Sequence, residues 1–227
     1  MRIGVVTGLQ RESQCLSGNP NSKDIMVKCA GARPDRAENC ATELLASGCG
    51  ALMSFGIAGG LSPELSAGQV VIADRVILPD GNEITTAENW RERLLAVLPR
   101  NGSVVVGPVA GSESVVAVPE AKQRVFETTG AIGVDMESHR VAGVASTAGV
   151  PFMVIRAVSD SSSQTIPPTA IDAIDAHGAP QYGKVITRLL RQPGDLPKLM
   201  RLSKDSETAL ASLRRVALTA GPLFRFA

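Results

Sequence analysis

Aromatic residues are scarce in this sequence, with five Phe, one Tyr and one Trp among 227 residues. That scarcity argues against a stacking platform for single-stranded nucleic acid, which needs several exposed rings. Net charge is also nearly absent, because 23 Lys and Arg stand against 22 Asp and Glu, which leaves +1. Since no global positive field attracts nucleic acid, we expect no nucleic-acid partner and only local contacts with phosphate.

Clustered metal ligands are missing as well. The four cysteines, Cys15, Cys29, Cys40 and Cys49, form no C-x-x-C pair and have no histidine nearby. Because zinc sites need closely spaced Cys and His ligands, we expect no metal and no other cofactor. Free thiols in a reducing compartment are the better interpretation of these cysteines.

Long apolar runs are the third absence. No apolar stretch reaches the roughly 18 residues that mark a membrane-spanning helix, and the opening residues 1–8 are too short and interrupted for a signal-peptide core. We therefore expect a soluble, cytoplasmic protein.

Short apolar runs alternate with helical patterns along most of the chain. Strand-like runs cover residues 3–7, 24–30, 51–55, 69–77, 103–109, 132–136 and 152–158. One helical pattern begins at Pro34 and ends at Gly48, and two others cover residues 119–129 and 137–148. Apolar strands between such helices predict a mixed sheet covered on both faces, hence a single-domain, three-layer α/β fold.

The composition changes after Leu190. Residues 191–197 have the Pro and Gly content of a linker, and residues 200–218 carry apolar side chains at helical spacing among Lys and Arg. We therefore predict a main domain over residues 1–190, then a linker and a basic, apolar helical segment over 191–227. Such a segment packs on its own domain or at a subunit interface. The competing hypothesis is peripheral membrane contact, with basic residues on anionic lipid and Leu and Phe in the headgroup boundary.

Three predicted strands each deliver a carboxylate near their carboxyl end, where open α/β sheets bind ligands. Glu12 follows the first strand, Glu137 follows the strand at 132–136, and Asp160 follows the strand at 152–158. Taken singly, they are explained as a solvated loop acid, a first-turn helix residue and a helix cap. Three carboxylates on one sheet edge instead favour a functional site.

The glycine-rich segment from Gly56 to Leu61 (GIAGGL) fits neither common nucleotide motif. Its G-x-x-G-G spacing differs from the dinucleotide fingerprint, and no Gly-Lys-Ser/Thr follows for a phosphate loop. A tight turn after a strand remains, where a ligand can approach bare backbone.

Three segments in the same order resemble the nucleoside phosphorylase/nucleosidase superfamily: residues 54–61 (SFGIAGGL), 133–138 (GVDMES) and 151–160 (PFMVIRAVSD). The opening MRIGVV with Glu12 soon after is similar to methylthioadenosine/S-adenosylhomocysteine nucleosidases, and the resemblance covers roughly residues 1–190. The whole chain looks most like the bacterial hopanoid-associated phosphorylases. This resemblance implies a partly barrel-like central sheet, a homodimer or higher homo-oligomer, and release of adenine from adenosylhopane.

The resemblance also implies roles on the sugar side of a nucleoside. Glu12 matches the general base that orients an attacking water, and Arg156 lies where the hydrolases use an arginine near that water. Glu137 matches the carboxylate that holds the ribose hydroxyls, with Met136 packing beneath the sugar.

On the base side, Asp160 matches the acid that protonates purine N7, a task for which its pKa should be raised. Gly59 and Val116 match backbone contacts to nucleophile or base, and Val115 and Ser159 complete the predicted substrate-binding set. Val115 stands where nucleosidases often carry a Phe that stacks on the base.

Two departures from the family pattern favour water over phosphate as the nucleophile. Ile57 replaces a serine that helps bind the nucleophile, and no arginine precedes Gly56 where phosphorylases use one. Arg11 and Arg156 can still hold an anion, so phosphate stays a candidate partner.

The leading hypothesis is therefore cleavage of the N-glycosidic bond of a 5′-substituted adenosine, with an adenosyl lipid preferred. One alternative is a methylthioadenosine/S-adenosylhomocysteine nucleosidase. Another is a non-catalytic nucleoside-binding protein, although a binder needs neither the acid nor the base.

Overall fold

Every predicted strand and helix is present in the computed structural model, which describes residues 2–17, 24–171, 175, 178, 179, 181, 187, 189 and 192–226. The described strands are β1 (Arg2–Thr7), β2 (Ile25–Cys29), β3 (Cys49–Gly60), β4 (Val70–Ile77), β5 (Glu83–Thr85), β6 (Val104–Gly111), β7 (Gly133–Asp135) and β8 (Phe152–Asp160). The described α-helices are α1 (Gln10–Gln14), α2 (Pro34–Ala46), α3 (Glu88–Leu95), α4 (Pro119–Thr129), α5 (Ser138–Ala148), α6 (Pro168–Ile171) and α8 (Leu196–Ala220). Short 3-10 helices occupy Pro193–Asp195 and Pro222–Arg225.

The sheet is mixed and closes partly on itself. Its main path runs β2-β1-β3-β7-β6-β4-β5, and β8 pairs with both β3 and β4. Pairing of β8 with β3 is parallel, whereas pairing of β8 with β4 is antiparallel. Because β3, β8, β4, β6 and β7 form a ring of neighbours, the predicted partly barrel-like sheet is confirmed.

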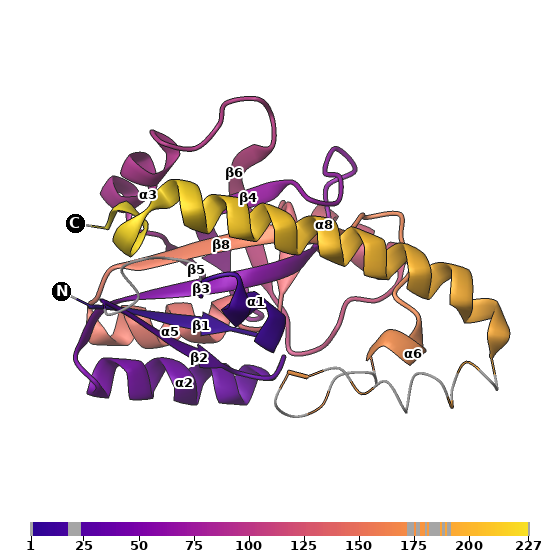
Figure 1. The fold of residues 1–227 in the computed structure, drawn as a ribbon, viewed down its shortest axis with the longest axis horizontal. Coiled ribbons are helices and arrows are strands. Elements are labelled where there is room, and N and C mark those ends of the chain that lie inside the picture. Colours follow the sequence, from indigo (N-terminus) through magenta and orange to yellow (C-terminus); the bar gives the residue numbers. More distant parts are fainter. Residues whose placement is uncertain are drawn as a thin grey trace.

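Helices cover the sheet on two faces, which confirms the predicted three-layer architecture (Figure 1). On one face, α2 and α5 contribute Leu44 and Val141 to one apolar core cluster. On the other face, α3 and α8 contribute Trp90 and Leu213 to a second cluster that also contains Phe55 of β3. These two cores hold the strands rigidly and leave their carboxyl ends available for a site.

The C-terminal helix is longer than the sequence predicts and completes the second core. The 3-10 turn at Pro193–Asp195 and the start of α8 at Leu196 replace much of the predicted linker over residues 191–197. Pro197 lies in the first helical turn, where proline costs no hydrogen bond.

Apolar side chains of this segment lie inside the protein. Leu210, Leu213, Val216 and Phe224 are buried against the sheet, while Leu218 is exposed. The Trp90 indole donates a hydrogen bond to the Phe224 carbonyl (2.8 Å), which fixes the chain end on α3. The side chains on which the membrane-contact hypothesis depends are therefore mostly occupied in packing, and the segment packs on its own domain.

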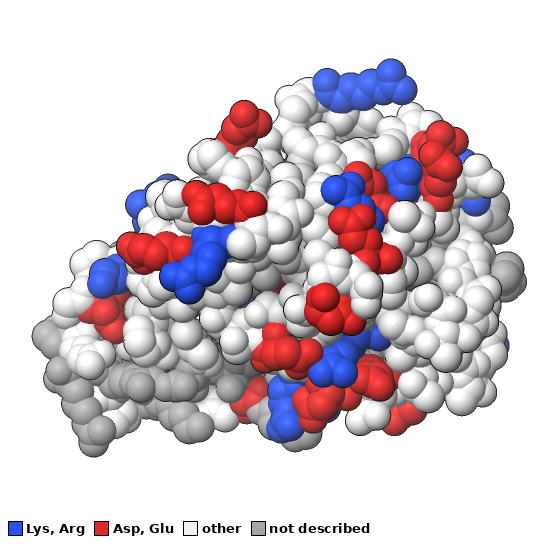
Figure 2. All heavy atoms as spheres, turned by 180° about the vertical axis from the view of Figure 1, so that it is seen from behind, with Lys and Arg blue, Asp and Glu red and all other residues white. Residues whose placement is uncertain are grey.

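Charged side chains of both signs are interspersed on the surface shown in Figure 2. Many are paired locally; for example, Arg140 lies 3.1 Å from Glu38 and 2.8 Å from Glu113. Within the described residues, no helix is long and apolar enough to cross a membrane.

Candidate active site

Glu12 joins the ends of β1 and β3. Its carboxylate is 1% exposed and accepts hydrogen bonds from the N–H groups of Gly8 (2.7 Å), Leu9 (2.8 Å) and Ile57 (2.9 Å). Burial raises the pKa of Glu12, although Arg156 and these three N–H donors oppose that effect. A carboxylate with a raised pKa is well suited to accept a proton from water.

Arg156 of β8 is buried and engaged by the protein itself. Its guanidinium contacts, through ion pairs or hydrogen bonds of 2.5–3.3 Å, Asp135, Glu137, Ser54, Ser138 and the carbonyl oxygen of Ile57. Each of its three nitrogen atoms has at least one of these partners. Arg156 therefore organises the surrounding carboxylates and hydroxyls.

Glu137 lies at the junction of β7 and α5, one residue before the helix begins. Its carboxylate is buried and lies 3.3 Å from an Arg156 nitrogen. Burial raises the pKa of Glu137 to about 8, against the lowering effect of Arg156 and with further raising effects from Asp135 and Glu12. Asp135 fixes the local backbone, because its Oδ1 accepts hydrogen bonds from the N–H groups of Glu137 (2.7 Å) and Ser138 (2.6 Å).

Asp160 ends β8 and is held from two sides. Its Oδ1 accepts a hydrogen bond from the Ser159 hydroxyl (2.7 Å), and its Oδ2 forms an ion pair with the ammonium group of Lys122. The Lys122 side chain is fully buried on α4. The predicted acid therefore has a charged partner that the sequence analysis did not identify.

The glycine-rich segment is not the predicted tight turn, because β3 continues as a strand through Gly60. Its glycines make room for the surrounding side chains. A Cβ on Gly56 would lie 2.6 Å from the Glu12 carboxylate carbon and 2.7 Å from an Arg156 nitrogen. A Cβ on Gly59 would lie 3.3 Å from Asp160 Oδ2. Glycine in this strand thus marks a close approach of functional groups rather than a bend.

An irregularity in the pairing of β3 with β8 aims Asp160 at this strand. The register shifts between Ala58 and Gly59, so that Asp160 rather than Ser159 lies opposite Gly59. Such bulges commonly redirect a side chain beside a ligand site.

The remaining predicted residues lie on segments that adjoin these carboxylates. Met136 is half-buried directly before Glu137. Val115 is 38% exposed, and Val116 packs against the small core cluster that contains Val134 of β7. The structure therefore joins Glu12, Glu137 and Arg156 in one network. It gathers Asp160 and Ser159, at the end of β8, beside Gly59 of β3 in a second network.

Sequence reasoning missed four members of these networks: Ser54, Lys122, Asp135 and Ser138. Ser54, Asp135 and Ser138 lay within the quoted motifs but had no assigned role. Lys122 carried a weaker signal, since it shares one helix face with Val125, Phe126 and Thr129 by i,i+3 and i,i+4 spacing. A lysine on the inward face of a helix needs a buried partner.

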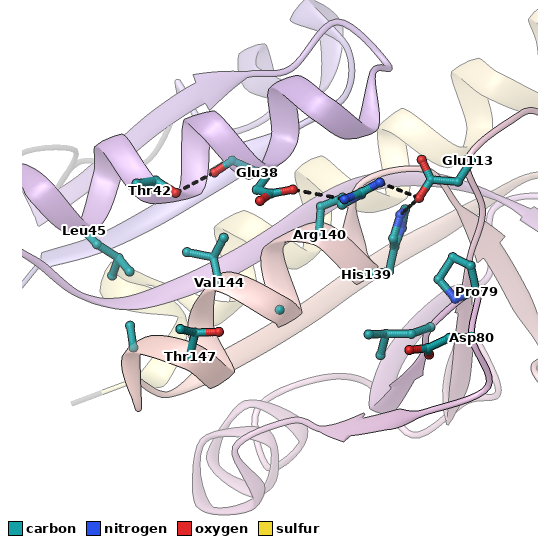
Figure 3. Close-up of a pocket in the computed structure, with 13 residues that line it drawn as sticks. Glu38, Thr42, Leu45, Pro79, Asp80, Glu113, His139, Arg140, Val144 and Thr147 are labelled. Carbon is teal, nitrogen blue, oxygen red and sulfur yellow. Dashed lines mark hydrogen bonds and ion pairs between the residues drawn. The ribbon is translucent and has the colours of Figure 1, made fainter.

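A separate cavity of about 720 Å³ lies between α2, α5 and the turn after β4. Figure 3 shows His139 and Arg140 of α5 directed toward Glu113, and Arg140 also bonds to Glu38. None of the predicted catalytic or substrate-binding residues lines this cavity. We therefore place the candidate site at the glycines of β3 and not in this cavity.

Comparison with known protein sequences identifies the family. The family model described as the Phosphorylase superfamily matches residues 10–191. The 5′-methylthioadenosine/S-adenosylhomocysteine nucleosidase of Mycobacterium bovis is 26% identical over 185 residues, which cover 63% of this chain and 72% of the relative. The enzyme of the same name from Treponema pallidum is 26% identical over 221 residues, covering 71% and 82%.

Solved structures share the fold at lower identity. Futalosine hydrolase of Helicobacter pylori superposes with a TM-score of 0.74 at 17% identity, covering 96% of each chain. The 5′-methylthioadenosine/S-adenosylhomocysteine nucleosidase of Neisseria meningitidis, in complex with methylthio-immucillin-A, superposes with a TM-score of 0.73 at 16% identity, covering 98% of this chain and 99% of that one. Since the family model spans most of the sequence, including Glu12, Glu137, Arg156 and Asp160, the chain belongs to the Phosphorylase superfamily.

Proposed function

We propose that the protein hydrolyses the N-glycosidic bond of a 5′-substituted adenosine and releases adenine. Its superfamily and the nucleosidases among its relatives make it an enzyme that cleaves N-glycosyl bonds. The observation that carries the finer proposal is the gathering of three carboxyl groups around the carboxyl ends of the strands: Glu12 and Asp160 lie against the glycines of β3, and Glu137 lies beside Gly8 and pairs with Arg156.

On the sugar side, Glu12 accepts a proton from a water molecule as the water oxygen forms a bond to C1′. Its buried position and raised pKa support this assignment. Glu137 holds the ribose hydroxyls, and Met136 packs beneath the ring. Negative charge within this cluster of carboxyl groups, which includes Asp135, stabilises the cationic, oxocarbenium-like ribosyl group of the transition state.

On the base side, the C1′–N9 bond breaks and its electron pair moves into the purine. Asp160 donates a proton to N7, so the base leaves as neutral adenine. The segment at Val115 and Val116 forms one wall of the purine site. Neither valine offers an aromatic ring that could stack on the base.

Water is favoured over phosphate because the site is rich in carboxyl groups and its arginine is paired with two of them. Arg156 serves Asp135 and Glu137. The other predicted anion holder, Arg11, forms an ion pair with Glu207 at 2.6 Å. A phosphate dianion in this buried cluster of carboxyl groups would meet like charge, which is costly in a buried site.

The 5′ substituent has two candidates. An adenosylhopane substrate is our preferred proposal, and it rests on the sequence resemblance to the hopanoid-associated group, since the C-terminal apolar side chains pack in the core. A methylthioadenosine or S-adenosylhomocysteine substrate is the second candidate, supported by the names of the relatives. Comparing kcat/KM for adenine release from the lipid in vesicles and from methylthioadenosine decides between them.

The test of the activity itself uses Asp160→Asn and Glu12→Gln. We expect wild-type protein to release adenine and each variant to lose about 10²- to 10⁴-fold in kcat. A non-catalytic nucleoside-binding protein would instead show tight binding without adenine release, and Asp160→Asn would leave that affinity unchanged.

A further inference from the structure

Lys122 is the buried charge that the proposed mechanism leaves unused. Its side chain is 0% exposed and lies on α4, away from the network of Arg156. Its ammonium group donates hydrogen bonds to Asp160 Oδ2 and to the carbonyl oxygens of Ser161 (2.8 Å) and Gln164 (2.9 Å).

These three acceptors match the three N–H donors of an ammonium group. A buried ammonium ion without such partners would carry a large desolvation cost. Among the three, only Asp160 carries a compensating charge. These three acceptors, which we call the cage, therefore suit a charged lysine, and the carboxylate among them is that of Asp160.

The cage also connects the acid to the segment that adjoins the base. Lys122 lies in the first turn of α4, which follows the loop that contains Val115 and Val116. The carbonyl oxygens of Ser161 and Gln164, which accept its hydrogen bonds, lie in the turn after β8. A backbone hydrogen bond from the Ile166 N–H to the Ala117 carbonyl (2.8 Å) joins the same two segments. Movement of either segment would therefore displace Asp160 relative to a bound purine.

We propose that Lys122 is a positioning residue for Asp160, an inference that rests on the proposed function. Lys122 holds Oδ2 while the Ser159 hydroxyl holds Oδ1, so the plane of the carboxyl group is fixed between them. To act as the acid, Asp160 first takes up a proton from solvent. When it gives that proton to purine N7, the carboxylate returns to the ionised form that pairs with Lys122 in the structure. The fixed ammonium group stabilises that charge without reorganisation of solvent.

A double-mutant cycle tests this role, with wild type, Lys122→Met, Asp160→Asn and the double variant assayed for adenine release. We expect Lys122→Met to lower kcat by about 10- to 100-fold with KM changed by less than about threefold, because a misplaced acid slows the chemical step more than binding. In the Asp160→Asn background, the Lys122→Met change should cost nothing further. Lys28→Met is the matched control, since Lys28 also pairs with a carboxylate, Glu43, but at the surface; it should keep wild-type kcat.

The outcomes separate the inference from the proposed function. If Lys122→Met keeps wild-type kcat, or if its loss multiplies with that of Asp160→Asn, Lys122 does not act through Asp160. If the single variant fails to fold, the comparison of Asp160→Asn with the double variant decides: equal residual rates support the inference and a further loss overturns it. If Asp160→Asn releases adenine at the wild-type rate, the proposed acid is wrong, and the role of Lys122 falls with it.

Discussion

Replacing Asp160 with Asn should destabilise the fold as well as slow the reaction. The Lys122 side chain is 0% exposed and that of Asp160 is 3% exposed, so their ion pair is shielded from water. Removing one partner of a buried pair leaves the other charge uncompensated and costs about 3–5 kcal/mol. That loss is a large part of the total free energy of unfolding of a domain, about 5–15 kcal/mol.

Removing both charges should restore most of the stability. In Asp160→Asn with Lys122→Met both charges of this buried pair are gone, and such replacements are commonly neutral or stabilising. We therefore expect the double variant to unfold within about 1 kcal/mol of wild type, whereas Asp160→Asn alone melts lower by about 6–20 °C. The exposed pair of Lys28 and Glu43 is the control, and its disruption should cost less than about 1 kcal/mol.

Urea unfolding followed by tryptophan fluorescence measures these differences. Trp90 is the one tryptophan in the sequence, and it is buried in the core on α3. Two results would refute the reasoning: Asp160→Asn unfolding within about 1 kcal/mol of wild type, or a double variant whose loss equals the sum of the single losses.

Three further predictions concern pH, the glycine strand and the C-terminal helix. Folding raises the pKa of Glu137 from 4.5 to about 8, so the stability that it contributes is fully present below about pH 4.5 and is lost as pH rises through about 8. Glu137→Gln should therefore flatten this part of a curve of Tm against pH. An unchanged slope would count against the assignment. Gly56→Ala should lower adenine release at least about 10-fold, since its Cβ would lie 2.6 Å from the buried base carboxylate, whereas Gly143→Ala, with nothing within 4 Å, should keep full activity; equal rates would contradict this. Leu213→Ala should cost about 2–5 kcal/mol in urea unfolding and Leu218→Ala, which is 58% exposed, less than about 0.5 kcal/mol; similar losses would show that the helix is not packed as described.

Most of the fold could be predicted from the sequence because its strands are apolar and its helices are punctuated by Pro and Gly. The helix over 119–129 was predicted with the bounds that α4 has in the structure. The continuation of β3 through Gly56–Gly60 could not be predicted, since glycines carry no side-chain pattern and the reason for them is the approach of side chains from other strands. The linker interpretation of residues 191–197 was partly wrong because Pro197 is equally compatible with the first turn of a helix.

Some residues of the candidate site could likewise be predicted from the sequence, and others could not. Glu12, Glu137 and Asp160 were recognisable because each follows a strand and each matches a family motif. Lys122 was not, because a lone lysine in a helix is usually solvated and only the fold reveals its three buried acceptors. The occupation of Arg156 by Asp135 and Glu137 likewise depends on segments far apart in the sequence.

Identification of the sugar product in the presence of excess phosphate tests the central claim most directly. Wild-type protein is incubated with 5′-methylthioadenosine or the adenosyl lipid, with and without phosphate. The products are then separated and identified by mass spectrometry. Hydrolysis predicts that adenine and a free reducing sugar form at the same rate in both buffers. A sugar 1-phosphate product, with adenine release that requires phosphate, would contradict it.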